Sequence, residues 1–214
     1  IKNPLTPIQL VIDNLKSKYI KNINPDLKEN YNKNLDTINN QIKQIENLVN
    51  EFSDFARMPK PILKDNDLIK ILKENLKLLS LIDKTIEIKL INNKDKILFN
   101  CDKEQIARVF FNLIKNSIES IQQKSDKNSN FVKKISIEIL YHNDHIKFIL
   151  IDNGIGFSDI KGKVKDIINP YYTTKKNGTG LGLSIVNKII NDHNGELNFF
   201  TISDGAKIEI NFKI

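Results

Sequence analysis

The sequence lacks several features that mark whole classes of protein. It has one cysteine, Cys101, so an internal disulfide is excluded. No apolar run approaches the roughly 18–20 residues that a helix needs to cross a bilayer. No signal peptide is visible, internal repeats are missing, and the lysines are not gathered into a block. We therefore expect these residues to make no direct membrane contact.

The composition that remains is that of a globular chain. Of the 214 residues, 40% are hydrophobic and 28% are charged, which is enough apolar material for a core. The net charge of +7 comes from lysines spread along the chain. Such a charge predicts a mildly basic surface and no nucleic-acid partner. Cys101 ends the apolar run 97–101, so we expect a small buried side chain there.

The first part of the chain has helical periodicity. A first helix precedes a turn at 22–26, and a longer helix is expected over 27–57. An antiparallel helical hairpin cannot bury the apolar stripe of the longer helix alone, so we expect a homodimer that forms a four-helix bundle. Packing of the stripe on the following domain is the alternative. The stripe consists of Leu35, Ile38, Ile42, Ile45, Leu48, Val49, Phe52 and Phe55.

The pattern changes after the linker Met58–Pro61 to mixed helices and strands. Residues 1–58 are therefore expected to form the dimerisation hairpin and 59–214 a second domain. The order of elements predicts an α+β protein, with the hairpin followed by an α/β sandwich that has a mixed sheet and helices on one face. Helices are expected over 67–80, 103–123 and 182–192, and strands over 85–91, 97–101, 134–141, 146–151, 196–202 and 206–213.

Two segments offer groups suited to a nucleotide. Asn112 and Asn116 are four residues apart and share one face of the predicted helix, with Lys115 beside them. Their amide oxygens suit a hard cation, and the lysine suits phosphate. Asp152–Gly156 follows an apolar strand, and a carboxylate at a strand end can accept a hydrogen bond from an amino group. Alone, each segment would read as solvent-facing amides or an ordinary turn.

Two further segments lie closer to the carboxyl end. Gly178–Leu183 leads into a helix, whose N-terminus favours an anion. It is not a Walker A loop, because no Gly-Lys-Ser/Thr follows. Pro170–Lys175 offers aromatic rings, two hydroxyls and a cation in a stretch long enough to form a lid.

The order and spacing of these segments resemble the catalytic region of bacterial sensor histidine kinases, within the superfamily shared by gyrase B, MutL and the large heat-shock ATPases. Asn112–Asn116 resembles the N box, Asp152–Gly156 the G1 box, Pro170–Lys175 the F-box region and Gly178–Gly182 the G2 box. The resemblance implies the histidine-kinase/gyrase-type ATPase fold for 59–214.

Two segments extend the resemblance to nearly the whole chain. Ile1–Pro7 resembles the tail of an H box, whose usual form is His-Glu-x-Lys-Asn-Pro-Leu. The end of the long helix, Glu51–Pro61, is similar to the NtrY branch of nitrogen-type sensors.

The resemblance implies a protein-histidine kinase that uses ATP and Mg²⁺. Asn116 would coordinate the metal with help from Asn112, Lys115 would reach a phosphate, and Asp152 would bind the adenine amino group. The γ-phosphate would pass to a His and then to an Asp of a response-regulator receiver domain. The implied catalytic residues are Asn3, Lys115 and Asn116. The implied nucleotide-binding residues are Asn112, Lys115, Asn116, Asp152, Gly154, Gly156, Tyr171, Tyr172, Thr174, Lys175, Gly178, Thr179, Gly180, Leu181 and Gly182.

The chain departs from the family pattern in three ways. It begins at Ile1, which predicts a piece of a longer protein whose phospho-accepting His lies just upstream. Asn3 falls where the family can orient water for dephosphorylation of the regulator, a role that is open without that His. Residue 117 is Ser where Ala is usual. The histidines present, His142, His145 and His193, fall in predicted surface turns, and none is assigned a catalytic role.

Three hypotheses follow. The first is the ATP-binding kinase core of a two-component sensor; the second is a nucleotide-binding and dimerisation remnant without autokinase activity. The third, another ATPase of the superfamily such as a mismatch-repair type, is disfavoured by the helical hairpin. The residues upstream of Ile1 decide between the first two. We expect this segment to be cytoplasmic and the full-length protein to be anchored in the bacterial inner membrane.

If the hairpin holds two copies together, removing all residues before Pro59 should convert a dimer into a monomer. The apolar stripe that drives association would then be gone. Light scattering of the 214-residue chain and of the truncated chain measures this. A dimeric truncated chain would place the interface in the second domain.

Overall fold

The computed structural model describes residues 5–19, 23–126, 130–157, 164–175 and 178–214. The chain divides into two compact units, Ile1–Met58 and Pro59–Ile214. No helix among the described residues is long and apolar enough to cross a membrane.

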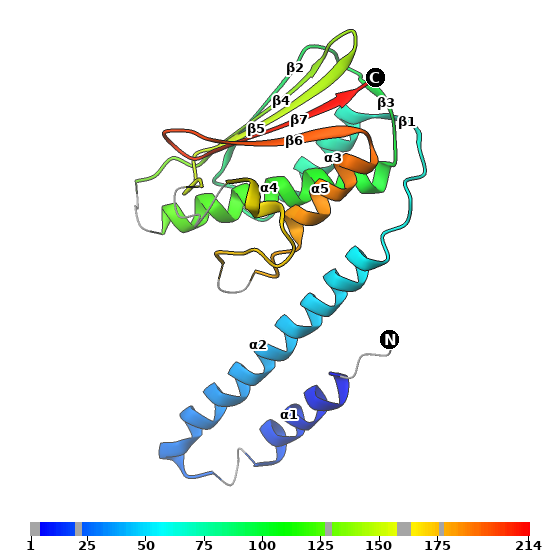
Figure 1. Ribbon diagram of the computed structural model, residues 1–214. Coiled ribbons are helices and arrows are strands. Elements are labelled where there is room, and N and C mark those ends of the chain that lie inside the picture. Colours follow the sequence, from blue (N-terminus) through cyan, green and yellow to red (C-terminus); the bar gives the residue numbers. More distant parts are fainter. Residues whose placement is uncertain (1–4, 20–22, 127–129, 158–163, 176–177) are drawn as a thin grey trace. The chain divides into compact units, whose positions relative to one another are not determined.

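The first unit is a helical hairpin, as predicted (Figure 1). Helix α1 spans Thr6–Tyr19 and helix α2 spans Pro25–Ala56, with the side chain of Asn24 accepting a hydrogen bond at the start of α2. Their contact is a small apolar cluster of Ile12, Leu35 and Ile42, against which Leu5, Leu15 and Tyr31 pack. The ion pair between Lys16 and Asp36, at 2.8 Å, lies across the same contact.

Much of the apolar stripe of α2 stays exposed in this single hairpin. Only Leu35 and Ile42 of the stripe are buried by α1. Phe55 is half-buried, and the other five side chains of the stripe are between 39% and 49% exposed: Ile38, Ile45, Leu48, Val49 and Phe52. The hairpin therefore presents a continuous apolar face.

The second unit is built on a five-stranded sheet of order β2-β4-β5-β7-β6. Only β2 and β4 pair in parallel, so the sheet is mixed, as predicted. Three helices cover one face of the sheet (Figure 1). The strands are β2 (Glu87–Asn92), β4 (Lys134–Tyr141), β5 (His145–Asp152), β6 (Gly195–Thr201) and β7 (Ala206–Lys213), and the helices are α3 (Leu68–Leu79), α4 (Lys103–Ser125) and α5 (Gly182–Asp192).

Helix α4 supplies much of the core. Seven of its apolar residues recur at helical spacing and are at most 5% exposed, whereas Phe111 is 37% exposed. The ring of Phe110 lies 5.0 Å from that of Phe148 on β5. Because this stripe must face the sheet, the orientation of every other side chain of α4 is fixed. The stripe consists of Ile106, Val109, Phe110, Leu113, Ile114, Ile118 and Ile121.

Two elements were not predicted. Strand β1 (Lys64–Asp67) pairs antiparallel with β3 (Leu98–Cys101) in a small second sheet. The sequence of β1 is Lys-Asp-Asn-Asp, which carries no apolar alternation and so gives no strand signal. A short 3₁₀ helix, η1 (Val164–Ile168), lies between the predicted strand 146–151 and the predicted helix 182–192, where neither a helix nor a strand was predicted, and it buries Ile167. The bounds of the other elements differ from the predicted ones by a few residues.

The expectation of a surface position is wrong for His193, which is only 5% exposed. Its Nδ1 lies 2.8 Å from the carbonyl oxygen of Ile189, and its Nε2 lies 3.0 Å from the backbone nitrogen of Asp102. A carbonyl only accepts and an N–H only donates, so Nδ1 carries the hydrogen of the neutral ring and Nε2 accepts. His193 thus ties the end of α5 to the start of α4.

Asp102 extends this connection to the segment before β1. Its carboxylate accepts hydrogen bonds from the backbone of Glu104 and Gln105, which caps α4, and from the backbone of Ile62 at 2.9 Å. Burial by itself raises the pKa of Asp102, but these three N–H donors outweigh it, and the pKa is lowered.

Replacing His193→Phe should lower the free energy of unfolding by about 2–4 kcal/mol. The ring volume is kept, but the N–H of Asp102 and the carbonyl of Ile189 lose their partner, at about 1–3 kcal/mol each. Urea denaturation measures the change, with His142→Phe at an exposed turn as the matched control. Equal midpoints for the two variants would show that the His193 contacts do not stabilise the fold.

Candidate nucleotide-binding site

Helix α4 brings Asn112 to the start of α5. Asn112 Oδ1 lies 4.0 Å from the position that a Cβ on Gly182 would occupy. Helix α5 starts at Gly182, and the side chain of its N-cap residue, Leu181, forms no capping hydrogen bond. Its first turn contains no acidic residue, so the N–H groups and the positive end of the helix dipole suit an anion.

Helix α4 also reaches the carboxylate of Asp152 at the end of β5. Asp152 is 3% exposed, and its Oδ2 accepts a hydrogen bond of 2.8 Å from the hydroxyl of Ser117. Its Oδ1 accepts one of 2.9 Å from the backbone N–H of Gly154. Burial raises the pKa of Asp152, although Ser117 and the backbone of Gly154 and Ala206 act in the opposite direction. A carboxylate has about four acceptor positions, so capacity for one further donor remains.

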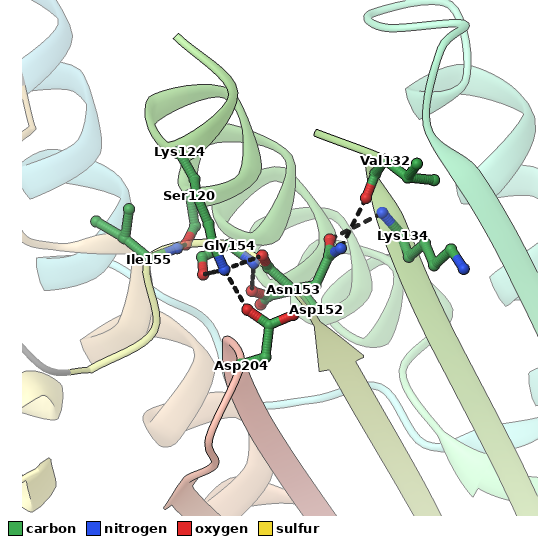
Figure 2. Close-up of polar contacts among 9 residues, drawn as sticks. All are labelled: Ser120, Lys124, Val132, Lys134, Asp152, Asn153, Gly154, Ile155 and Asp204. Atoms are coloured by element: carbon green, nitrogen blue, oxygen red, sulfur yellow. Dashed lines mark hydrogen bonds and ion pairs between the residues drawn. The ribbon is translucent and has the colours of Figure 1, made fainter. Parts of the chain in front are cut away.

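The turn after Asp152 is fixed on the side of β4 by Asn153. Its side chain accepts from the backbone of Lys134 at 2.8 Å and donates to the carbonyl of Val132 at 2.7 Å (Figure 2). Both bonds use the amide of one side chain, so the turn is held in a single orientation relative to β4.

Helix α4 and the β6–β7 hairpin fix the other side of this turn (Figure 2). The ammonium of Lys124 donates to the carbonyls of Asn153 and Gly154, at 2.9 and 3.1 Å, and forms an ion pair with Asp204. The hydroxyl of Ser120 accepts from the N–H of Ile155 at 3.1 Å. Lys124 therefore joins three segments that are distant in sequence.

Two glycines of this turn are required by close approach. A Cβ on Gly154 would lie 2.3 Å from Ser120 Oγ and 2.7 Å from its backbone carbon. Gly156 has a φ of 67°, and a Cβ there would lie 2.4 Å from the carbonyl oxygen of Gly205. The turn thus packs directly on α4 and on the β6–β7 hairpin.

The predicted F-box and G2 segments contact each other. The backbone N–H of Tyr171 donates to the carbonyl of Gly180 at 3.0 Å. Gly180 has a φ of 71°, and a Cβ there would lie 2.4 Å from the carbonyl carbon of Tyr171. Tyr171 itself has a φ of 68°, which is unusual for a side chain of its size. A Cβ on Gly178 would likewise lie 2.4 Å from Thr173 Oγ1.

Lys175 reaches back from this segment to α4. Its ammonium donates to Asn116 Oδ1 at 2.9 Å and forms an ion pair with Glu119. Lys115 lies 3.8 Å from the other carboxylate oxygen of Glu119. The amide assigned to metal binding is therefore in contact with a cation of the protein itself.

The structure thus gathers most of the residues selected from the sequence, in two groups along α4. The first group lies around residues 112–116 of α4 and contains Asn112, Asn116, Lys175 and Gly182. The second lies around residues 117–120 of α4 and contains Asp152 and Gly154, with Ser117 as the helix residue that contacts Asp152. Tyr171 and Thr174 are exposed, Tyr172 is half-buried, and Thr179 accepts a weak hydrogen bond of 3.4 Å from the N–H of Leu181. Asn3 lies outside the described residues.

Sequence reasoning missed four side chains of α4: Ser117 as a partner of Asp152, and also Glu119, Ser120 and Lys124. Asn116, Ser120 and Lys124 recur every four residues, so the helical period placed them on one face. That period alone does not show which loops lie against the face.

Comparison with known proteins agrees with this geometry. Residues 101–214 match the family described as histidine kinase-, DNA gyrase B-, and HSP90-like ATPase, which covers more than half of the chain. The chain belongs to this family. Residues 1–61 match the His Kinase A (phospho-acceptor) domain.

Relatives of the chain are sensor histidine kinases by name. It is 36% identical over 216 residues to a putative sensor histidine kinase NtrY-like of Rickettsia felis, which covers 100% of this chain and 34% of that protein. It is 32% identical over 225 residues to the nitrogen regulation protein NtrY of Azorhizobium caulinodans, which covers 100% of this chain and 27% of that protein. The chain therefore spans about a third of the length of these relatives or less.

Solved structures share the fold. The histidine kinase ThkA in complex with the response regulator protein TrrA matches 99% of this chain and 58% of the solved chain, with a TM-score of 0.69 and 22% identity. The Acinetobacter baumannii histidine kinase AdeS matches 97% of this chain and 95% of the solved chain, with a TM-score of 0.62 and 19% identity.

The raised pKa of Asp152 predicts a pH-dependent cost in stability. A carboxyl whose folded-state pKa is raised from 3.8 contributes stability that is fully present below pH 3.8 and is lost as the pH rises through the folded-state value. Asp152→Asn should remove this loss, so the variant should gain stability relative to the natural chain as the pH rises from 3.8 to neutral.

Urea denaturation at a series of pH values measures the difference. Asp95→Asn, at an exposed position, is the matched control and should show no such trend. A constant difference between Asp152→Asn and the natural chain at all pH values would contradict a raised pKa.

Proposed function

We propose that this chain is the ATP-binding kinase core of a sensor histidine kinase. The observation that carries the proposal is that one helix, α4, contacts both halves of the site. Ser117 bonds to the buried carboxylate of Asp152, and Asn116 of the same helix faces Lys175. ATP offers an amino group at its adenine end and carries phosphates and a cation at the other end. The carboxylate of Asp152 suits the amino group, and the residues around Asn116 suit the cation and the phosphates.

Asp152 is the residue proposed to select adenine. It is buried, and the turn that follows it is fixed by Asn153 and Lys124, so its carboxylate is preorganised. A site built to accept a hydrogen bond from a particular amino group strongly rejects a base that lacks it.

Asn116 and the start of α5 are proposed to hold the phosphates and Mg²⁺. A hard divalent cation such as Mg²⁺ binds oxygen atoms, some from the protein and some from the phosphates. Asn116 Oδ1 is such an oxygen, and it already contacts the ammonium of Lys175. The residues present therefore fit such a cation. The bound cation would neutralise phosphate charge, while Asn112, Asn116 and the N–H groups at the start of α5 would orient the γ-phosphate.

The helical hairpin is proposed to complete the kinase as a homodimer. The exposed stripe of α2 is the kind of face that a second copy buries in a four-helix bundle. The γ-phosphate would pass to a His of the phospho-acceptor domain and then to an Asp of a response regulator. The relatives named as sensor kinases and the domain matched by residues 1–61 support this. A membrane anchor in the remainder of the full-length protein belongs to the same proposal.

The 214-residue chain should bind ATP with Mg²⁺, and Asp152→Asn should weaken binding by on the order of tenfold or more, because a hydrogen bond to a charged acceptor is lost. Calorimetry measures the affinity, and Asp95→Asn should leave it unchanged.

The chain should not label itself with γ-phosphate. His193 is buried with both ring nitrogens hydrogen-bonded, and His142 and His145 lie at the β4–β5 turn. Incubation with radiolabelled ATP tests this in the same samples. Full affinity in Asp152→Asn would contradict the adenine assignment, and label on the chain would reveal another acceptor.

A further inference from the structure

Lys175 contacts two oxygen atoms of α4 that together could also bind a metal cation. Its ammonium bonds to two oxygens of α4, the amide oxygen of Asn116 and a carboxylate oxygen of Glu119. These residues are three apart in the helix and so share one face. The side chains of Lys175 and Glu119 are 32% and 38% exposed, so the pair is partly shielded from water.

This arrangement is a cation held by a neutral oxygen and an anionic one. The same donor set suits a hard divalent cation, which takes amide and carboxylate oxygens. An ammonium and a divalent cation cannot share these oxygens, because like charges at such a separation repel strongly. Whatever cation binds Asn116 must therefore first displace Lys175.

We propose that Asn116 and Glu119 form a two-oxygen cation site, which the ammonium of Lys175 occupies until a divalent cation replaces it. The proposal deepens the proposed function and rests on it, since the replacing cation is the one that accompanies the nucleotide. It adds Glu119 to the site as a ligand for the cation. It also makes Lys175 a competitor of the metal before it becomes available to a phosphate.

Lys115 does not take the same position. It lies 3.8 Å from Glu119, its side chain is 49% exposed, and the two residues are neighbours because Lys115 precedes Glu119 by four residues in the same helix. Lys175 comes instead from a segment 59 residues from Asn116 along the chain. Exchange of cations would thus release a contact between two distant segments and not merely rearrange one helix surface.

Binding of Mn²⁺ to the nucleotide-free chain tests the proposal directly. Mn²⁺ is measured by the loss of the free-ion signal in electron paramagnetic resonance. Lys175→Met should bind Mn²⁺ at least tenfold more tightly than the natural chain, because the competing ammonium is gone. The double variant Lys175→Met with Glu119→Gln should lose that gain, because a charged ligand is removed.

Lys188→Met is the matched control. Lys188 is another partly exposed lysine, in an ion pair with Asp192 on α5, so this variant makes the same change in net charge on a different element from Asn116 and Glu119. Equal affinity in Lys175→Met and Lys188→Met would overturn the proposal. So would tight Mn²⁺ binding that persists in the double variant, since Glu119 would then not be a ligand.

Calorimetry of ATP with Mg²⁺ on the same proteins separates this proposal from the proposed function. If the natural chain does not bind ATP, the proposed function fails, whatever Mn²⁺ shows. If it binds ATP and Lys175→Met does not change Mn²⁺ affinity, only the exchange of cations fails.

Discussion

The packing of helix α4 against the sheet is the constraint on which the rest of the site depends. Its apolar stripe is almost completely buried, so the helix cannot rotate without exposing the core. The side chains at the border of the stripe are therefore held at fixed positions. Asn112, Asn116, Ser117 and Ser120 all lie within the 23 residues of this rigid element. Asn112 lies near the start of α5, Asn116 contacts Lys175, and Ser117 and Ser120 contact the end of β5 and the turn after it. The distance between the two parts of the site, which a bound nucleotide would have to span, is therefore set by a single helix.

Burial of the Asp152 carboxylate at the end of β5 lowers the stability of the folded chain at neutral pH. Burial disfavours the charged form of Asp152, and its pKa is raised even though Ser117 and two backbone groups stabilise the charge. The fold keeps a group that lowers its own stability at neutral pH. A carboxylate that is already desolvated and oriented needs little rearrangement to accept a donor from a ligand, and this is the physical advantage of retaining it.

Lysines connect the loops of the site to α4. Lys124 ties the helix to the turn after β5 and to the β6–β7 hairpin, and Lys175 ties it to the segment before α5. The two lysines differ in the kind of acceptor that they contact. Lys124 bonds to backbone carbonyls of a turn whose Gly154 already packs against α4, so it reinforces a fixed structure. Lys175 bonds to the side-chain oxygens of Asn116 and Glu119, which we propose as ligands of a nucleotide-bound cation.

The sequence by itself determined the classes of element and selected the residues that we propose bind the nucleotide. Helical and strand periods are local, so they placed α4, α5 and most of the sheet, and the resemblance selected Asn116, Asp152 and the glycines. It did not predict β1, because the pairing of Lys64–Asp67 with β3 depends on a distant partner and not on its own polar sequence. It also placed His193 at the surface, although that side chain is buried between α4 and α5. Only the tertiary structure decided that Ser117 supports Asp152 and that Lys175 rests on Asn116 and Glu119. Those contacts join residues 35 to 59 positions apart, and the periodicity of a single segment contains no information about what will pack against it.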